Sequence, residues 1–344
     1  MTDRSIVVVG AGIVGASLAY HLAGNGRPVT VIDAGLPGSG VTQASFAWIG
    51  RTVGSDRPSA PLRCLALDDY RRLETELPGL AIRWTGSLTW DGFDDEPGPT
   101  TTEVAAVEPH LLDPPPAAIH RPEDAAFDPV AATELLIAAA RDRGARVLAG
   151  TPAVALEQRA GTVVGVRTTA GELPAETVVL AAGTGSVALG AGVGITLPVE
   201  PSPAVLVRLR ATPGLVRGIV ASPALEVRQL DDGTVLAPTT YGGEIDQAAL
   251  LATARRVRDR FAAAFAGAGD AEIVSAEIGW RPMPVDDEPI VGPPPGVGGL
   301  YVALTHSAIT LAAALGRLAA AEILTGRPAP ELAGCRPDRF AVTS

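Results

Sequence analysis

The sequence contains no lysine, because all 27 of its Lys and Arg residues are arginines. No lysine can therefore form a Schiff base, act as a general base or place a compact point charge in an active site. The chain of 344 residues has only two cysteines, Cys64 and Cys335, which lie far apart in the sequence. This spacing predicts neither a disulfide framework nor a metal site, and it is typical of a protein of the reducing cytoplasm.

Positive charge is scarce as well, and the formal net charge is −11. Nucleic acids and anionic membrane surfaces are bound through cations, so neither is an expected partner. The first residues, "MTDRS", carry no apolar stretch or cleavage site. The longest apolar tract, residues 300–324, contains His306, Arg317 and Glu322, which favours a strand and a helix over a membrane span.

A glycine turn between an apolar strand and an apolar helix is the first clear motif. Gly10, Gly12 and Gly15 follow the strand of residues 5–9, and a second strand ends at Asp33. In a G-x-G-x-x-G turn the first glycine allows the tight turn, the second admits a pyrophosphate at the helix start, and the third lets helix and strand pack closely. Asp33 would bind ribose hydroxyls and repel a 2′-phosphate, which excludes NADP. The motif does not distinguish NAD from FAD.

Periodicity predicts further elements along the chain. Short alternating runs over residues 204–240 predict an antiparallel sheet. Because residues 277–292 contain three prolines among mixed polar and apolar residues, we expect an exposed, rigid turn there. Helices are expected at residues 62–77, at 129–143 after an Asp128 cap, at 247–265 and at 307–325.

Three stretches together resemble the D-amino-acid-oxidase-like flavoproteins, a family that includes glycine oxidase and sarcosine oxidase. They are "VVVGAGIVG…VTVID", "VVLAAGTGS" and "GWRPMPVDDEPIVG…GLYVALTHSAITLAAALG", which span nearly the whole chain. The resemblance implies an α/β fold with a Rossmann-like FAD-binding domain built from discontinuous segments, and an α+β substrate domain with an antiparallel sheet. The FAD-binding domain would comprise residues 1–80, 125–195 and 278–344, and the substrate domain residues 81–124 and 196–277.

The resemblance also suggests roles for residues in the last third of the chain. Arg281 would hold a substrate carboxylate with its two-pronged guanidinium group. The alternative is that Arg281 pairs with Asp286, Asp287 or Glu288 and only fixes the loop. His306 is a second catalytic candidate, unless it only makes local hydrogen bonds at a helix start. Tyr241 is a third, because Tyr241 and Arg228 belong to the predicted antiparallel sheet, from which they would face the flavin ring on its other side.

The cofactor site implied by the resemblance runs from the glycine turn to the start of the last helix. In "LTHSAIT" the helix dipole and free N–H groups would face the flavin N1–C2=O edge. Trp48 and Arg51 would line the pocket. The cofactor-binding residues expected are Gly10, Gly12, Ile13, Val14, Gly15, Asp33, Ala34, Ser39, Thr42, Ala44, Ser45, Val154, Ala182, Gly183, Arg281, Thr305, His306, Ser307, Ile309 and Thr310.

The chain departs from the family pattern in three places. Residues 279–282 read Gly-Trp-Arg-Pro and lack the cysteine that holds the flavin in sarcosine-oxidase-like members, so FAD should be bound non-covalently. The lysine that assists oxygen reduction in sarcosine oxidases has no counterpart. The segment between Trp90 and Glu108 is short, which predicts a small substrate cover and an open pocket.

These features lead us to expect an FAD-dependent oxidoreductase that removes a hydride from a carbon bearing nitrogen. The substrate would be an amino acid or related amine, the product an imine, and O2 the electron acceptor. One alternative is a dehydrogenase of 2-hydroxy acids with His306 as base. Another is a flavin-carrying subunit that meets a partner through an exposed apolar face at residues 91–118. Fold analogy does not choose among them.

Overall fold

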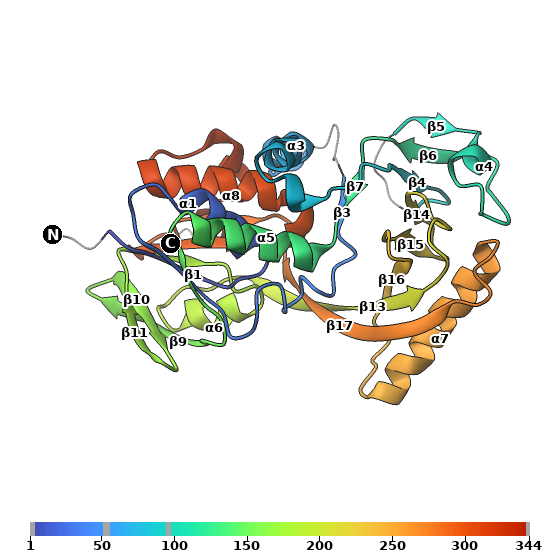
Figure 1. Ribbon diagram of the computed structural model, residues 1–344. Helices are drawn as coiled ribbons and strands as arrows, with labels where there is room; N and C mark the ends of the chain where they lie inside the picture. The colour runs from blue at the N-terminus through green and yellow to red at the C-terminus, as the bar shows by residue number, and fades with distance from the viewer. Residues whose placement is uncertain (1–3, 51–55, 94–97, 342–344) are drawn as a thin grey trace.

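The computed structural model describes residues 4–50, 56–93 and 98–341. They form two bodies, each built on a β-sheet. Two long strands, β13 (Val199–Arg210) and β17 (Glu272–Pro284), arch from one body to the other (Figure 1). Both strands belong to the sheet of the second body, and β17 runs through residue 278, where a domain boundary is expected from the sequence.

The first body contains a six-stranded sheet in the order β18-β19-β12-β1-β2-β8. All neighbours are parallel except β18 and β19, which are antiparallel. All four residues of β1 are buried, as expected of a parallel strand that is covered on both faces. The strands are β1 (Ile6–Val9), β2 (Val29–Ile32), β8 (Arg146–Leu148), β12 (Thr177–Leu180), β18 (Ile290–Gly292) and β19 (Leu300–Leu304).

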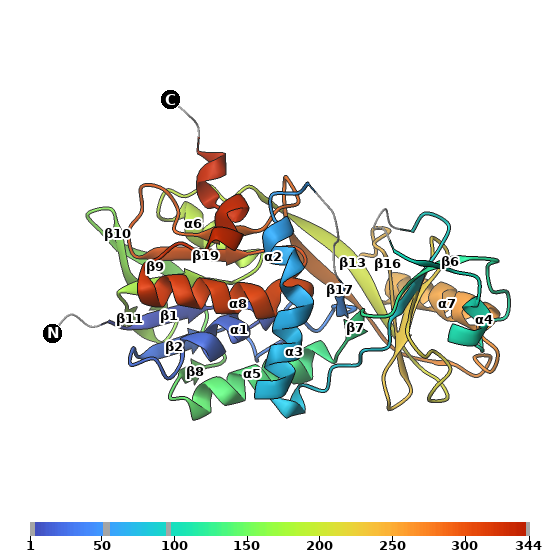
Figure 2. The ribbon, with the colours of Figure 1, turned by 90° about the horizontal axis from the view of Figure 1, so that it is seen from above.

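Helices cover one face of this sheet and a β meander covers the other. Figure 2 shows α2 (Ala60–Cys64) and α3 (Ala66–Glu76) lying across α8 (Ala308–Thr325), with α1 (Ile13–Leu22) and α5 (Pro129–Asp142) beside it. The meander consists of β9 (Ala153–Arg159), β10 (Thr162–Thr168) and β11 (Gly171–Pro174), and the short helix α6 (Gly185–Ala191) lies with it. Since successive residues of a strand face opposite sides, Ile6 and Val8 pack under the helices, whereas Val7 and Val9 pack on the meander.

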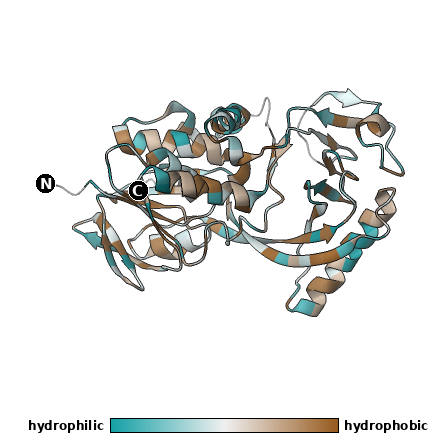
Figure 3. Ribbon diagram, in the orientation of Figure 1, coloured by the Kyte–Doolittle hydropathy of each residue, from teal (hydrophilic) through white to brown (hydrophobic). Residues whose placement is uncertain are grey.

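The second body contains an eight-stranded sheet in the order β17-β13-β16-β15-β14-β4-β6-β5. Val205 and Val207 of β13 share a core with Val257 and Phe261 of the helix α7 (Gln247–Ala264). Hydrophilic and hydrophobic residues alternate along α7, because only one of its faces enters this core (Figure 3). The remaining strands are β4 (Ser87–Thr89), β5 (Thr100–Thr101), β6 (Ala118–Arg121), β14 (Ile219–Ala221), β15 (Glu226–Gln229) and β16 (Thr234–Thr240).

Small elements complete the described chain. The strands β3 (Trp48–Ile49) and β7 (Ala125–Ala126) pair between the two bodies, and α4 (Val104–Val107) lies near β6. Three 3₁₀ helices span Pro78–Leu80, Pro330–Cys335 and Pro337–Phe340.

The α/β fold expected from the sequence is confirmed, with one parallel and one antiparallel system. The expected helix of residues 62–77 is interrupted at Leu65 and forms α2 and α3. At α5 the Asp128 side chain accepts hydrogen bonds from the N–H groups of Val130 and Ala131, at 2.9 and 3.0 Å, as its N-cap position predicts.

The prediction of an exposed turn over residues 277–292 is wrong. This segment continues β17 up to Pro284, and only the residues after it form a turn before β18. Prolines are tolerated here because β17 is an edge strand, so N–H groups that point away from β13 need no partner. Pro282 lies opposite Pro201, at the end of β13 where β16 no longer pairs.

The apolar character of α8 is explained by its place in the core. By length and composition alone this helix is long and apolar enough to cross a membrane, but 61% of it is buried inside the protein. It crosses α1 closely, and the Ser17 hydroxyl donates a hydrogen bond to the Ala312 carbonyl at 2.6 Å. The prediction of a core helix at this position agrees with that packing.

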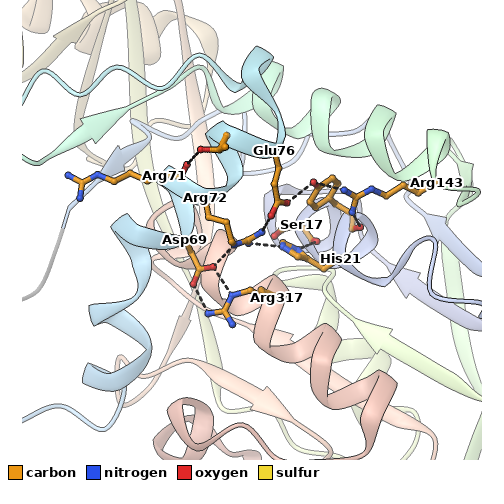
Figure 4. A network of polar contacts seen from close by, with 10 residues as sticks. Ser17, His21, Asp69, Arg71, Arg72, Glu76, Arg143 and Arg317 are labelled. Atoms are coloured by element: carbon orange, nitrogen blue, oxygen red, sulfur yellow. Dashed lines mark hydrogen bonds and ion pairs between the residues drawn. The ribbon is translucent and has the colours of Figure 1, made fainter.

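A polar network joins α1, α3 and α8 at the edge of this core (Figure 4). Asp69 accepts two hydrogen bonds from the Arg317 guanidinium group, at 2.6 and 2.8 Å, and one from Arg72 at 3.1 Å. Arg72 also lies 3.0 Å from Nε2 of His21, whose Nδ1 lies 2.8 Å from the Ser17 carbonyl oxygen. These contacts require a neutral His21 that donates through Nδ1 and accepts through Nε2.

Candidate active site

One cavity of about 990 Å³ extends from the glycine turn after β1 to the sheet of the second body. Its volume lies at the upper end of the range of about 300–1,000 Å³ that is usual for ligand pockets. Its walls come from both bodies. The first body contributes the turns after β1, β2 and β12, the segment of residues 40–50 that contains β3, and the start of α8. The second body contributes the strands β13, β15, β16 and β17.

The glycine turn has the geometry that the motif predicts. Gly10 has φ +109°, and a Cβ there would lie 2.7 Å from the Ala181 carbonyl carbon. Gly12 is the N-cap of α1, and a Cβ there would meet only Thr42 Oγ1, at 3.2 Å. A Cβ at Gly15 would collide with the Gly10 backbone, so Gly15 allows helix and strand to pack and does not line the cavity.

Asp33 lies at the end of β2 and lines the cavity. Its Oδ2 accepts a hydrogen bond from the Ala11 N–H at 2.6 Å, and its Oδ1 accepts one from the Gly35 N–H at 2.7 Å. These bonds fix the carboxylate, and a carboxylate oxygen has a second lone pair that can accept from a ribose hydroxyl.

A second glycine turn follows β12 on the other side of β1. Ala182 and Gly183 line the cavity there, and Gly183 has φ +56° with no atom within 4 Å of the position that a Cβ would take. Val154 of β9 lines the same end of the cavity and is 49% exposed. The backbone in this turn therefore faces open space on the side where a nucleotide would lie.

The start of α8 forms the opposite wall of the cavity. Thr305, His306 and Ser307 connect β19 to α8, and no side chain caps the first turn of the helix. Uncapped N–H groups and the positive end of the helix dipole favour negative charge at this point. Arg63 of α2 adds a full positive charge, with its Nη1 3.5 Å from the Ser307 hydroxyl.

His306 is held in its neutral form. Burial lowers the pKa of His306 to about 4, and the positive charges of Arg281 and Arg63 act in the same direction. The imidazole is therefore uncharged at neutral pH, and it is a weak base.

Arg281 projects from β17 into the cavity and contacts Ser202 of β13. Its Nη2 donates to the Ser202 hydroxyl at 2.9 Å and its Nε to the Ser202 carbonyl at 3.3 Å. Asp286 instead pairs with Arg339 at 2.8 Å, and Glu288 accepts from the Ser59 N–H at 3.0 Å. No ion pair within 4.0 Å joins Arg281 to Asp286, Asp287 or Glu288, all of which are described, so the alternative in which it pairs with one of them is not observed.

Three predicted contacts are corrected by the structure. The Ser39 hydroxyl donates to the Leu36 carbonyl at 2.7 Å and does not line the cavity. Tyr241 packs on Trp280, with ring centroids 6.0 Å apart, on the face of the sheet against which α7 packs. It faces away from the cavity because side chains alternate along β16 and the residue after it. Arg228 is buried and donates to the carbonyls of Phe46 and Phe127, so it is structural.

The other expected cofactor residues all line the cavity. They are Gly10, Gly12, Ile13, Val14, Asp33, Ala34, Thr42, Ala44, Ser45, Val154, Ala182, Gly183, Arg281, Thr305, His306, Ser307, Ile309 and Thr310. Trp48 also lines it, stacked on Phe93 and bonded through Nε1 to Asp124 Oδ2 at 2.9 Å. Arg51 lies outside the described residues.

Several charged residues of the cavity wall are marked by no sequence signal. Arg63, Arg121, Asp124 and Glu226 come from three separate regions of the chain and belong to no motif. Arg121 and Glu226 lie in the short strands β6 and β15, and the face of the sheet that each occupies becomes known only when the strands pair.

These features fit FAD. The glycine turn and Asp33 suit its adenosine diphosphate part, and the start of α8 suits the electron-rich edge of its ring. Neither cysteine lines the cavity, since Cys335 is buried in the core and Cys64 faces elsewhere, which agrees with non-covalent binding. Among the described residues, no group of three or more His, Cys, Asp or Glu side chains is arranged to hold a metal ion.

Known proteins agree with this interpretation. Uncharacterized oxidoreductase YurR of Bacillus subtilis (strain 168) is 28% identical over 347 residues, which cover 91% of this chain and 93% of that protein. D-amino acid dehydrogenase of Methylobacterium sp. (strain 4-46) is 28% identical, over 95% of this chain and 96% of that protein. The crystal structure of glycine oxidase from Geobacillus kaustophilus has a TM-score of 0.84 at 24% identity, covering 98% and 99% of the two chains.

The family comparison covers most of the chain, from the first strand into the last helix. Residues 5–322 match the family described as FAD dependent oxidoreductase. This range includes both glycine turns, Asp33, Arg281 and the start of α8. The chain therefore belongs to the FAD dependent oxidoreductase family.

Proposed function

We propose that this enzyme uses non-covalently bound FAD to oxidise the C–N bond of an amino acid or related amine to an imine. The observation that carries the proposal is Arg281, which enters the cavity from β17 and has Ser202 rather than a carboxylate as its partner. A guanidinium group in that position can bind a substrate carboxylate through two hydrogen bonds. Glycine oxidase and D-amino acid dehydrogenase, to which the chain is similar, have names that agree with such substrates.

The chain's own residues would orient the substrate. FAD, when bound, supplies the hydride acceptor. Arg281 would fix the carboxylate and hence the position of the substrate C–H bond. Such positioning can lower the activation barrier by several kcal/mol. The dipole of α8 and the charge of Arg63 stabilise negative charge at the opposite wall. Trp48 and Phe93 are stacked on each other and line the cavity, where they would limit the access of water to a bound substrate.

The ionisation of His306 argues against the oxidation of a 2-hydroxy acid with this residue as the base. Oxidation of a hydroxyl group needs a base to take its proton, and His306 is the sequence candidate. Because burial lowers the pKa of His306 to about 4, this imidazole is a poor acceptor for a hydroxyl proton. A neutral amine can lose a hydride from carbon without a base, since the nitrogen lone pair stabilises the product.

The surface gives little support to a flavin-carrying subunit that needs a partner. Within the described parts of residues 91–118, Leu112 is the one large apolar side chain that is clearly exposed, at 58%. A docking face would need a contiguous apolar patch of several hundred Å².

Molecular oxygen is the acceptor that we propose. Lysine is absent from the whole chain, so the cation near the reacting end of the cavity would be an arginine, of which Arg63 and Arg281 are the candidates. Both cysteines are free, which agrees with the cytoplasmic location that we also propose.

The test is anaerobic bleaching of the flavin by pools of amino acids, amines and 2-hydroxy acids, followed by exposure to air. We expect amino acids to bleach it and air to restore the colour. Arg281→Ala should weaken the binding of carboxylate substrates by about 10–100-fold, because a charge-assisted hydrogen-bonded pair is lost. Amines without a carboxylate serve as the internal control and should be unaffected. If the variant weakens both classes equally, Arg281 does not bind the carboxylate.

A further inference from the structure

A carboxylate that no sequence motif singles out lies beside Arg281. Glu226 is the first residue of β15, and its neighbour Val227 packs into the core under α7. Because side chains alternate along a strand, Glu226 points to the opposite face, where it lines the main cavity together with Arg281. The same two residues also line an adjoining cavity of about 340 Å³.

Glu226 and Arg281 have opposite charges but do not touch. Each influences the ionisation of the other, yet no nitrogen–oxygen contact within 4.0 Å joins them. Arg281 uses Ser202 as its hydrogen-bond partner, and Glu226 has no hydrogen bond to another described residue. Glu226 is partly buried, and a carboxylate drawn away from water is costly unless a ligand completes its contacts.

Two opposite charges that line the same cavity suit a ligand that carries both. An α-amino acid in its usual form has an ammonium group and a carboxylate on one carbon. With the carboxylate on Arg281, the ammonium group can lie toward Glu226. Charge complementarity of this kind orients the ligand, because the reversed orientation would place like charges together.

From this arrangement we infer that Glu226 accepts the ammonium proton of an α-amino acid substrate whose carboxylate is held by Arg281. The inference rests on the proposed oxidation of amino acids. In the first step the N–H bond of the ammonium group breaks, its proton passes to a Glu226 oxygen, and the electron pair stays on nitrogen. The neutral amine can then lose a hydride from carbon, whereas an ammonium group has no lone pair to form the C=N bond.

The ionisation of Glu226 is suited to this role. Burial raises the pKa of Glu226 to about 7, and the positive charge of Arg281 opposes that rise. Glu226 is thus ionised and able to accept a proton above about pH 7, and it is protonated below. Among the described residues, the other charged or titratable groups that line the two cavities are Asp33, Arg63, Arg121, Asp124, Arg260 and His306.

The test compares wild type with Glu226→Gln, which keeps the shape of the side chain but removes the proton acceptor. The measurement is the apparent second-order rate constant of anaerobic flavin reduction, taken below saturation between pH 6 and pH 9, because it reports the ionisation of the free enzyme. For wild type we expect a rise through about pH 7. For the variant we expect a rate at least about 100-fold lower at pH 8, because general bases contribute about 10²–10⁴-fold. Glu272→Gln, an exposed position on the same sheet, is the matched control and should behave as wild type.

A binding measurement provides a readout that is independent of turnover. Propionate has a carboxylate and no amine, and its binding can be followed by the change in flavin absorbance. In wild type its affinity should fall as the pH rises through 7, because ionised Glu226 repels a second carboxylate. In Glu226→Gln the affinity should be higher at pH 8 and independent of pH over this range.

The outcomes separate the inference from the function on which it rests. If wild type is bleached by amino acids and the variant keeps the wild-type rate and pH profile, Glu226 does not accept the proton. The inference also fails if the variant loses activity only toward substrates with a second positive charge, since Glu226 would then bind that distal group. If no amino acid bleaches wild type, the proposed function itself is wrong, and the inference falls with it.

Discussion

The crossing of α1 and α8 gives a sharp test of the structure, because both helices begin at the cavity. Gly316 of α8 lies directly against Ser17 of α1. A Cβ at Gly316 would lie 2.8 Å from the Ser17 Cβ and 3.0 Å from the Ser17 carbonyl carbon. Non-bonded carbon atoms normally lie about 3.5–4.0 Å apart, so Gly316→Ala would force the helices apart by roughly 1 Å or less.

Two effects of opposite sign decide the size of the change. Overpacking a core contact typically costs about 1–3 kcal/mol. Alanine is favoured over glycine in a helix interior by about 1 kcal/mol. Because the added Cβ would overlap both the side chain and the backbone of Ser17, we expect the cost of overpacking to exceed the gain in helix propensity. The net loss in the free energy of unfolding should be about 1–2 kcal/mol. The separated helix starts should also bind FAD more weakly.

Urea unfolding of the FAD-free protein measures the stability, and flavin fluorescence titration measures the affinity for FAD. Ser17→Gly removes two of the three colliding atoms, the Ser17 Cβ and Oγ, so the double variant should recover part of the loss caused by Gly316→Ala. Strict additivity of the two changes would show that the residues do not touch. A Gly316→Ala protein as stable as wild type would refute the close crossing.

Two further predictions concern the network of Figure 4. Asp69→Asn should lower the free energy of unfolding at pH 7 by about 1–2 kcal/mol, measured by urea unfolding, because Arg317 and Arg72 lose their shared carboxylate while remaining partly solvated. His21 has its pKa lowered to about 4 by burial, so below about pH 6.5 the unfolded chain takes up a proton that the folded chain does not. Stability should therefore fall by about 2 kcal/mol from pH 7 to pH 5 through this residue. His21→Gln should remove that part of the pH dependence, and an unchanged slope would contradict the assignment.

The pattern of the sequence was sufficient for the elements whose signals are local. The helix α5 begins at its Asp128 cap, and its connection to β8 carries Gly144 with φ +94°. The turn after β1 could be predicted because its glycine spacing is a short local motif, and a Cβ at Gly10 or Gly15 would collide with nearby backbone atoms. The expected turn over residues 277–292 failed because prolines normally interrupt strands, and the edge position that tolerates them is a property of the whole sheet.

The same distinction applies to the site. Most of the residues predicted at the cofactor end line the cavity, because short motifs carry them. The exceptions are Gly15, which packs against the Gly10 backbone, and Ser39, which bonds to the Leu36 carbonyl. Tyr241 was misplaced since its side depends on the register of β16, where a shift by one residue exchanges the two faces. Glu226 and Arg63 were missed because nothing in their neighbouring sequence marks them.

By itself, then, the sequence determined the nucleotide-binding strand, turn and helix, the absence of lysine chemistry and the arginine that faces the cavity. These depend on backbone sterics and residue chemistry, which act over a few positions. The tertiary structure decided which distant side chains meet. It placed Glu226 beside Arg281, placed Arg63 at the start of α8 and lowered the pKa of His306. Such encounters depend on how β15, β17, α2 and α8 pack, because burial and long-range electrostatics arise only when segments far apart in the chain come together.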